Sequence, residues 1–285
     1  MLRRSLTALV LGSLALPACD GTQDPPGVAA TTSTVVTTTL APSAASLGPE
    51  GLKALEQQPA STPPLADAVA PPPPASGDLP GMPGPSPAVG PAGAPVRVYV
   101  FTDFECPVCR RSVEPLKLLA RSHPEDVRLV VKHAASPLHR NAPGAAAASI
   151  AAFRQGRFWA YHDRLFRDRG LDDAALLAVA EGAGLDTAQW RHDLAHESVT
   201  AQVAYETALA GTLGLASTPS FVVNGHVQRG WGSYQGLAAV VERELARARA
   251  IAAEGVAAAQ VAYEATRRNG ETGPALAAAL FEQAD

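Results

Sequence analysis

Two cysteines separated by two residues stand where an apolar strand gives way to a helix. Cys106-Pro107-Val108-Cys109 follows Val96–Phe101, a run that reads as a buried strand. Proline suits the first helical turn, because no N–H is required of it there. A sulfur at this junction faces the unpaired N–H groups and positive dipole end of the helix, which favour a thiolate. The spacing therefore predicts a redox dithiol, with Cys106 exposed and acidified and Cys109 one turn deeper.

The first residues have the pattern of an export signal. Arg3 and Arg4 precede an apolar run, Leu6–Leu16, that is too short to span a bilayer. The next residues, Leu16-Pro17-Ala18-Cys19, resemble the bacterial lipoprotein box, in which signal removal leaves a diacylated cysteine. We therefore expect residues 1–18 to be a lipoprotein-type signal peptide and Cys19 to be the lipid attachment residue. The alternative is an ordinary secretory signal with an incidental Cys19.

These expectations place the protein in the bacterial cell envelope, lipid-anchored to a membrane and facing the periplasm or the exterior. The chain has three cysteines, so only Cys106 and Cys109 remain if Cys19 carries lipid. No structural disulfide can then form without consuming that pair, and two thiols are too few for a four-cysteine zinc site. We expect neither a metal nor a cofactor. In an oxidising compartment such a dithiol is catalytic or structural.

Composition separates a long leader from the folded part. Residues 19–94 are mostly Pro, Ala, Thr, Ser and Gly, as in Thr31–Thr39 and Pro71–Pro74. Such a stretch has little apolar surface to bury, so we expect a disordered tether ending at Ala94. A low-complexity insert without function is the alternative. The formal net charge of −4 argues against a nucleic-acid partner.

From residue 95 the pattern alternates between strands and helices. A strand (Val96–Phe101), a helix to about Ser122 and a second strand (Val127–Val131) imply a right-handed crossover and a parallel pair. A helical stretch from about 141 to 211 follows. Asn224-Gly225 then lies between Phe221–Val223 and Val227–Arg229, which is a strong hairpin signal. A helix from Ser233 to about Ala250 ends this part.

This order of elements and three motifs resemble the DsbA-like branch of the thioredoxin superfamily. The motifs are Phe101–Cys109, Gln155–Trp159 followed by His162, and Ser217–Gly225. The resemblance covers residues 95–250. It implies an α/β protein with a thioredoxin fold and a helical subdomain inserted at about 141–211.

The resemblance also assigns roles to individual residues. It makes Cys106 the nucleophile and Cys109 the resolving cysteine, with Pro107 and Val108 completing the catalytic motif. It matches Thr218-Pro219 to a cis-proline loop whose backbone pairs with an extended substrate segment.

The function implied is thiol–disulfide exchange with exported cysteine-containing proteins, followed by recycling through a membrane or periplasmic redox partner. We favour an oxidase, because isomerases usually need a dimerisation module and none is evident. Strongly oxidising DsbA enzymes have His where Val108 stands, and thioredoxin and DsbA have a buried acid where Val100 stands. We therefore expect an oxidant of intermediate strength.

Other polar and apolar side chains are weaker candidates. His133 and His139 could approach the cysteines, although solvated or core-edge histidines are the simpler interpretation. His162 and Trp159 share an apolar helix face, which favours core packing. Val108 and Leu138 together suggest an apolar substrate surface.

Two other classes of function fit a dithiol. A metallochaperone could bind Cu(I) through Cys106 and Cys109, because soft thiolates suit that ion. The chain has only two methionines, Met1 and Met82, to add to such a site. A non-catalytic binding module on a tether, with incidental thiols, is the other alternative.

The last residues form a separate segment. Ala259–Glu264 repeats the six residues Ala201–Glu206, and one repeat does not make a solenoid. We expect residues 251–285 to be an accessory helical tail, with a docking segment for a partner as the alternative.

Overall fold

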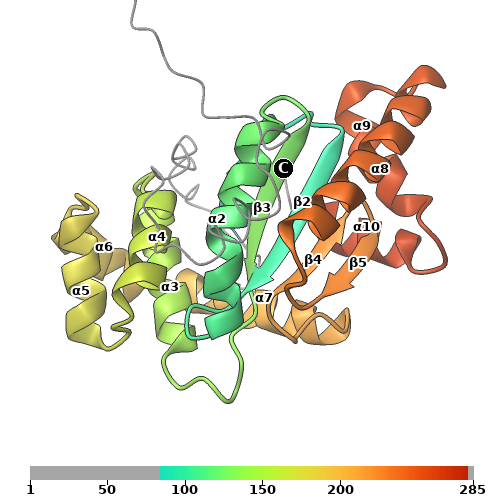
Figure 1. Cartoon of the computed structure of the whole chain (residues 1–285). Helices are drawn as coiled ribbons and strands as arrows, with labels where there is room; N and C mark the ends of the chain where they lie inside the picture. The colour runs from blue at the N-terminus through green and yellow to red at the C-terminus, as the bar shows by residue number, and fades with distance from the viewer. Residues whose placement is uncertain (1–83, 282–285) are drawn as a thin grey trace, which may run out of the picture. The chain divides into compact units, whose positions relative to one another are not determined.

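The computed structural model describes residues 84–281. The predicted signal peptide, Cys19 and most of the predicted tether lie outside the described residues. Within residues 84–281, no helix combines the length and apolar character that crossing a bilayer requires. These residues form a five-stranded sheet with helices on both of its faces (Figure 1).

The sheet has a mixed topology with strand order β1-β3-β2-β4-β5. Its strands are β1 (Ala88–Val89), β2 (Val96–Thr102), β3 (Val127–His133), β4 (Ser220–Val223) and β5 (His226–Arg229). β2 and β3 are parallel, as the predicted crossover requires, and the other three pairs are antiparallel. β2 is therefore central, flanked by β3 and β4.

The side chains of β2 alternate between two cores, because successive residues of a strand point to opposite faces. Val96, Val98 and Val100 pack with α2 (Pro107–Ser122) and α8 (Tyr234–Ala253). Tyr99 and Phe101 belong to the core on the other face. Figure 1 shows α2 and α8 crossing the same face of the sheet.

The C-terminal segment covers that second face. It contains α9 (Ala258–Arg267) and α10 (Gly273–Phe281), and Leu276 and Leu280 of α10 join the core around Tyr99. The Tyr99 hydroxyl donates a hydrogen bond of 2.9 Å to the Leu280 carbonyl. The predicted accessory tail is thus helical, but α10 is part of the main core. The alanine-rich sequence did not show which surface it would cover.

The predicted helical insertion is present between β3 and β4. Its helices are α3 (Ala142–Arg154), α4 (Phe158–Asp168), α5 (Asp173–Gly182), α6 (Thr187–Leu194) and α7 (Glu197–Thr212). The first two pack with Phe104 and Val113 around the cysteines in one apolar cluster. Figure 1 places α3 to α6 on one side of α2, away from α8 to α10. The insertion therefore packs on the end of α2 that carries Cys106.

The predicted hairpin is confirmed at Asn224-Gly225, where both residues have positive φ, 41° and 87°. A Cβ on Gly225 would also lie 2.9 Å from the Thr266 carbonyl of α9. Both the positive φ and this close approach therefore favour glycine at position 225. The Asn224 side chain accepts from the Arg97 N–H at 2.9 Å and donates to the Pro95 carbonyl at 2.9 Å. The turn is thereby fixed to β2, and Gly225 lies close to Thr266 of α9.

The ordered part begins before Pro95, which corrects the predicted end of the tether at Ala94. β1 pairs antiparallel with β3, with Ala88 opposite Val130, and the Val131 N–H donates to the Pro87 carbonyl at 2.8 Å. The local composition, rich in Pro, Gly and Ala, predicts disorder here. A two-residue strand forms only where a partner strand offers its edge. That partner is about forty residues later in the chain, so no local pattern reveals it.

Candidate active site

The cysteine pair lies at the start of α2, as the sequence predicted. Cys106 is the N-cap residue, with extended backbone (φ −75°, ψ 120°), and Pro107 is the first helical residue. Cys109 follows one turn into the helix and is 1 % exposed. Cys106 is itself only 6 % exposed, so the expectation of an exposed nucleophile is corrected. Pro107 is exposed and Val108 is half-buried.

A second loop covers Cys106 because of the sheet register. Phe101 at the end of β2 is opposite Ser220 at the start of β4, so the segments that follow β2 and precede β4 meet. The Thr218–Pro219 peptide is cis, as the resemblance implied. Cys106 Sγ lies 3.5 Å from the Thr218 carbonyl oxygen. This contact explains why the sulfur is more buried than a helix N-terminus alone predicts.

The two thiols have opposite acidities. A hydrogen bond from the Cys109 thiol is the largest of the effects that lower the pKa of Cys106 to about 5. The backbone N–H groups of Cys109 and Val108 and the Thr218 side chain add to it, and burial opposes it. Burial raises the pKa of Cys109, and its hydrogen bond to Cys106 raises it further. The site therefore holds one thiolate and one neutral thiol at neutral pH.

A buried carboxylate orders the loop that leads to Cys106. Asp103 accepts from the Glu105 N–H at 2.8 Å, the Ser136 N–H at 2.9 Å and His139 Nδ1 at 2.8 Å. Its hydrogen bond to His139 is the main reason that the pKa of this imidazole is raised, and the charge of Cys106 contributes to the same shift. His139 is thus held beside the site by a carboxylate, a partner that the sequence reasoning did not identify.

The other histidine after the second strand has a structural role. His133 Nδ1 lies 2.8 Å from Glu206 and its Nε2 lies 2.9 Å from the Ser149 hydroxyl. Burial alone would raise the pKa of Glu206, but the hydrogen bonds from His133 lower it to about 2. The three side chains are at most 1 % exposed. Because Ser149 is buried, it cannot reach a substrate as a nucleophile. The arrangement therefore joins β3 to α3 and α7 and is not a second site.

A charged cluster lies beneath the cysteines, between α2 and α4. Lys117 donates to Glu114 at 3.0 Å and to Asp163 at 2.7 Å, and all three are buried. His162 Nδ1 lies 3.0 Å from the other oxygen of Asp163. Burial would raise the pKa of Asp163, but the hydrogen bond from His162 and the Lys117 charge lower it. The predicted core packing of His162 among aromatic rings is present, but the carboxylate partner was not foreseen.

A family model described as thioredoxin matches residues 83–243, which is more than half of the chain. This chain belongs to the thioredoxin family. The matched region begins near β1 and includes both cysteines, the helical insertion and the cis-proline loop. This thioredoxin-family domain has the DsbA-like form, with its helices inserted between β3 and β4.

Solved structures share this fold. A thioredoxin-like oxidoreductase from Silicibacter pomeroyi is 34 % identical, with a TM-score of 0.52, and the match covers 57 % of this chain and 92 % of that one. The thiol-disulfide exchange protein α-DsbA2 from Wolbachia pipientis is 18 % identical over 55 % of this chain and 86 % of that one, with a TM-score of 0.51. The latter likeness concerns the fold alone.

A curated relative has a different description. The Na⁺/H⁺ antiporter NhaA 3 of Salinispora tropica is 35 % identical over 162 residues, which are 56 % of this chain. The chain spans only a quarter of the length of that protein. Ion transport is a property of that whole protein and is not transferred to the thioredoxin-family domain described here.

Metal ligands are sparse around the cysteines. Within residues 84–281, His, Cys, Asp and Glu side chains nowhere gather in groups of three or more that could hold a metal ion. Cys106 and Cys109 are both free thiols. The arrangement offers a soft two-sulfur pair whose first member is ionised, which is the requirement for thiol–disulfide exchange.

Proposed function

We propose that this thioredoxin-family protein exchanges disulfides with exported cysteine-containing proteins, and that it acts as an oxidase. The observation that carries the proposal is the difference between its thiols: Cys106 has a pKa lowered to about 5, and Cys109 is buried and neutral. A low pKa stabilises the reduced form, so it makes the corresponding disulfide a stronger oxidant.

The exchange follows from this difference. In the oxidised protein, a client thiolate attacks Cys106 and Cys109 leaves with the electron pair of the broken bond. A second client thiolate then attacks the client sulfur of the mixed disulfide, and Cys106 leaves as a stable thiolate. The client gains one disulfide and the Cys106–Cys109 pair gains two electrons. A disulfide-bearing partner in the envelope would reoxidise the pair.

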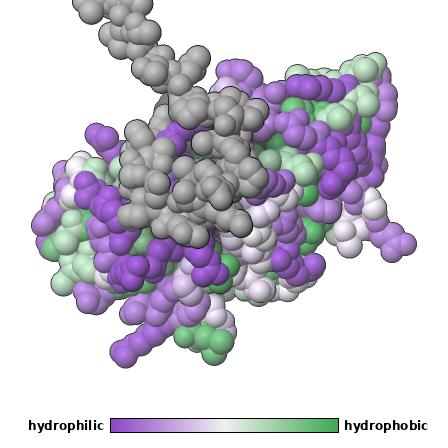
Figure 2. Space-filling model, viewed as in Figure 1, coloured by the Kyte–Doolittle hydropathy of each residue, from purple (hydrophilic) through white to green (hydrophobic). Residues whose placement is uncertain are grey.

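Thr218 and Pro219 are proposed to hold the client. The Thr218 carbonyl lies beside Cys106, so an extended client segment aligned along this loop would bring its sulfur to the same point. Val108 and Leu138 would add apolar contacts. Leu138 is the one large hydrophobic side chain that is exposed among residues 84–281, at 90 %. Figure 2 shows an exposed hydrophobic patch at the lower edge of the molecule, over the loop that follows β3.

Turnover of a reduced, unfolded protein that becomes active only with its native disulfides tests the proposal. Wild-type protein should restore activity, Cys106→Ser should not, and Cys109→Ser should accumulate a covalent complex with the client on a non-reducing gel. Equal turnover by wild type and Cys106→Ser would exclude catalysis and favour a tethered binding module. Retention of Cu(I) against a competing chelator without turnover would favour a metallochaperone.

The choice of oxidase is tested by the reduction potential. Equilibration with a glutathione buffer should give a value between those of thioredoxin, about −270 mV, and DsbA, about −120 mV. A value at the thioredoxin end would contradict an oxidase and favour a reductase. Faster repair of a scrambled protein than oxidation of a reduced one would favour an isomerase.

A further inference from the structure

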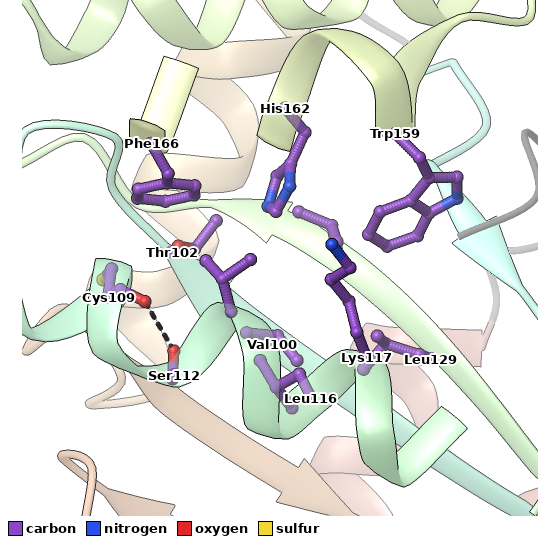
Figure 3. A pocket seen from close by; sticks show the side chains of 12 residues that line it. Val100, Thr102, Cys109, Ser112, Leu116, Lys117, Leu129, Trp159, His162 and Phe166 are labelled. Atoms are coloured by element: carbon purple, nitrogen blue, oxygen red, sulfur yellow. Dashed lines mark hydrogen bonds between the residues drawn. The ribbon is translucent and has the colours of Figure 1, made fainter. Parts of the chain in front are cut away.

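The start of α2 and the end of α4 meet at the cysteines, and each carries an arginine. Phe166, in the last turn of α4, lines the same small cavity as Cys109, and Figure 3 shows its ring above the first turn of α2. Arg169 is the residue that ends α4. Arg110 directly follows Cys109 in α2. The packing of the two helices therefore brings both arginines to the cysteine-bearing end of α2.

Arg110 shares a helix face with the reactive cysteine. Its N–H donates to the Cys106 carbonyl at 3.3 Å. Residues four apart on a helix are neighbours on one face, with Cβ atoms about 5–6 Å apart. A client that is joined to Cys106 by a mixed disulfide therefore has its neighbouring residues within reach of the Arg110 side chain.

The two guanidinium groups lie near each other without an anion between them. Within residues 84–281 neither Arg110 nor Arg169 forms an ion pair, and the Arg110 Nε atom is buried without a hydrogen-bond partner. Burial lowers the pKa of Arg110, and the charge of Arg169 lowers it further. A carboxylate that joined the pair would offset both the repulsion and the cost of burying an unpaired charge.

The protein's own anions at this end are bonded to other groups. Several carboxylates near the two arginines in the sequence accept hydrogen bonds elsewhere: Glu105 from the Asn141 N–H at 2.8 Å, Glu114 from Lys117 at 3.0 Å, Asp168 from Arg167 at 2.7 Å and Asp172 from the Ala175 N–H at 2.9 Å. The Cys106 thiolate is stabilised by a thiol, a hydroxyl and backbone N–H groups. The positive charge of Arg110 and Arg169 is therefore available to a bound molecule.

We propose that Arg110 and Arg169 bind a carboxylate of the client, so that clients with an acidic residue close to the reacting cysteine are preferred. Guanidinium groups suit this task because their planar N–H groups match the two oxygens of a carboxylate. The contact forms while the client sulfur approaches and joins Cys106. This assignment names a class of client and rests on the proposed thiol–disulfide exchange.

Two model peptides that differ at one position test the preference. Each has a single cysteine with Glu or Gln next but one to it, and each is mixed as the reduced thiol, in excess, with the oxidised full-length protein. The initial rate of thiol loss is divided by the rate of the same peptide with 5,5′-dithiobis(2-nitrobenzoate), which removes the effect of the charge on the peptide thiol itself. The corrected rate should be about three- to tenfold higher for the Glu peptide at low salt.

Salt gives an independent measurement on the wild type. Arg169 is exposed, so its attraction to a carboxylate is open to screening by ions. Raising the salt from about 20 mM to about 500 mM should bring the corrected ratio of the two peptides towards one.

Arg169→Asn is the informative variant, because asparagine tolerates the left-handed backbone of this position (φ 66°) and has no charge. It should lower the corrected ratio by about twofold or more, whereas Arg169→Lys keeps the charge and should retain most of the preference. Arg191→Gln is the matched control. Arg191 is exposed and forms no ion pair within residues 84–281, and it belongs to α6, which Figure 1 places at the outer end of the insertion.

The control should keep the wild-type ratio. Equal corrected rates of the two peptides with the wild type, or an equal loss of preference in Arg191→Gln, would overturn the assignment. A full preference in Arg169→Asn, or one that salt does not weaken, would do the same, because charge attraction to this pair would not be its cause. Failure of both peptides to react with the wild type would instead contradict the proposed function.

Discussion

Cys106 and Cys109 are identical side chains, yet they meet different atoms. Cys106 receives hydrogen bonds from a thiol and from backbone N–H groups that the start of α2 leaves unpaired. Cys109 lies among Phe104, Val113 and the helical insertion, where burial disfavours a charge more strongly than hydrogen bonds from Thr102 and the Asp103 backbone favour it. The position of Cys106 at the N-cap therefore determines that Cys106, and not Cys109, is the thiolate.

This difference predicts the pH dependence of alkylation. The rate at which iodoacetamide modifies the reduced protein should be constant above about pH 6 and fall tenfold per unit below the Cys106 pKa of about 5. Cys109→Ala removes the largest hydrogen bond that lowers this pKa, so its midpoint should move upward. A wild-type midpoint near that of free cysteine would contradict the proposed thiolate.

The lowered pKa of Cys106 also makes the free energy of unfolding of the reduced protein depend on pH. The folded-state pKa of Cys106 is below its unfolded value of 9.0. Its contribution to the free energy of unfolding of the reduced protein is therefore fully present above pH 9 and lost as the pH falls through about 5. The disulfide form has no such thiolate and should lack this dependence, which parallel urea titrations of both forms would show.

At the scale of elements, α10 is the part whose role differs most from its prediction. Leu280 is fully buried against the sheet face that carries Tyr99 and Phe101. Leu280→Ala should lower the free energy of unfolding by about 2–5 kcal/mol, because it removes buried methyl groups and leaves a cavity. Urea denaturation monitored by circular dichroism measures this loss.

The same substitution at an exposed position is its control. Leu138 is 90 % exposed, so Leu138→Ala should change the free energy of unfolding by no more than about 0.5 kcal/mol. Equal effects at the two positions would show that α10 does not pack on the sheet.

Elements with a local signature could be predicted from the sequence. The Val96–Thr102 strand, the helix after Cys106 and the Asn224-Gly225 turn each depend on residues within a short window. β1 and the docking of α10 depend on partners far along the chain, so composition gave an unstructured leader and an accessory tail. Burial of Cys106 depends likewise on the distant Thr218 loop.

The residues of the candidate site divide in the same way. Local sequence motifs are sufficient to identify four of them, which are Cys106, Cys109, Thr218 and Pro219. Asp103, Lys117 and Asp163 are not identified in this way, because their roles arise only when α2, α4 and the loop after β3 come together. The apolar face of its helix predicts a core position for His162, and the carboxylate that holds it is its own neighbour in sequence.

At the scale of the whole molecule, the expected membrane anchor is a proposal about Cys19. Cys19→Ser should move the protein from the detergent phase to the aqueous phase in a detergent phase-partition assay, because a diacyl chain supplies the affinity for the membrane. Wild-type protein in the aqueous phase would contradict lipidation and support an ordinary secretory signal.

The segment around β1 bears on the proposed exchange of disulfides with unfolded client proteins. An open strand edge invites foreign strands to pair with it, which starts aggregation. Pro87 accepts from the Val131 N–H, and Arg128 donates to the Gly90 carbonyl at 2.7 Å, so this short piece occupies the outer edge of β3. Partly folded client chains therefore cannot pair with the outer edge of β3.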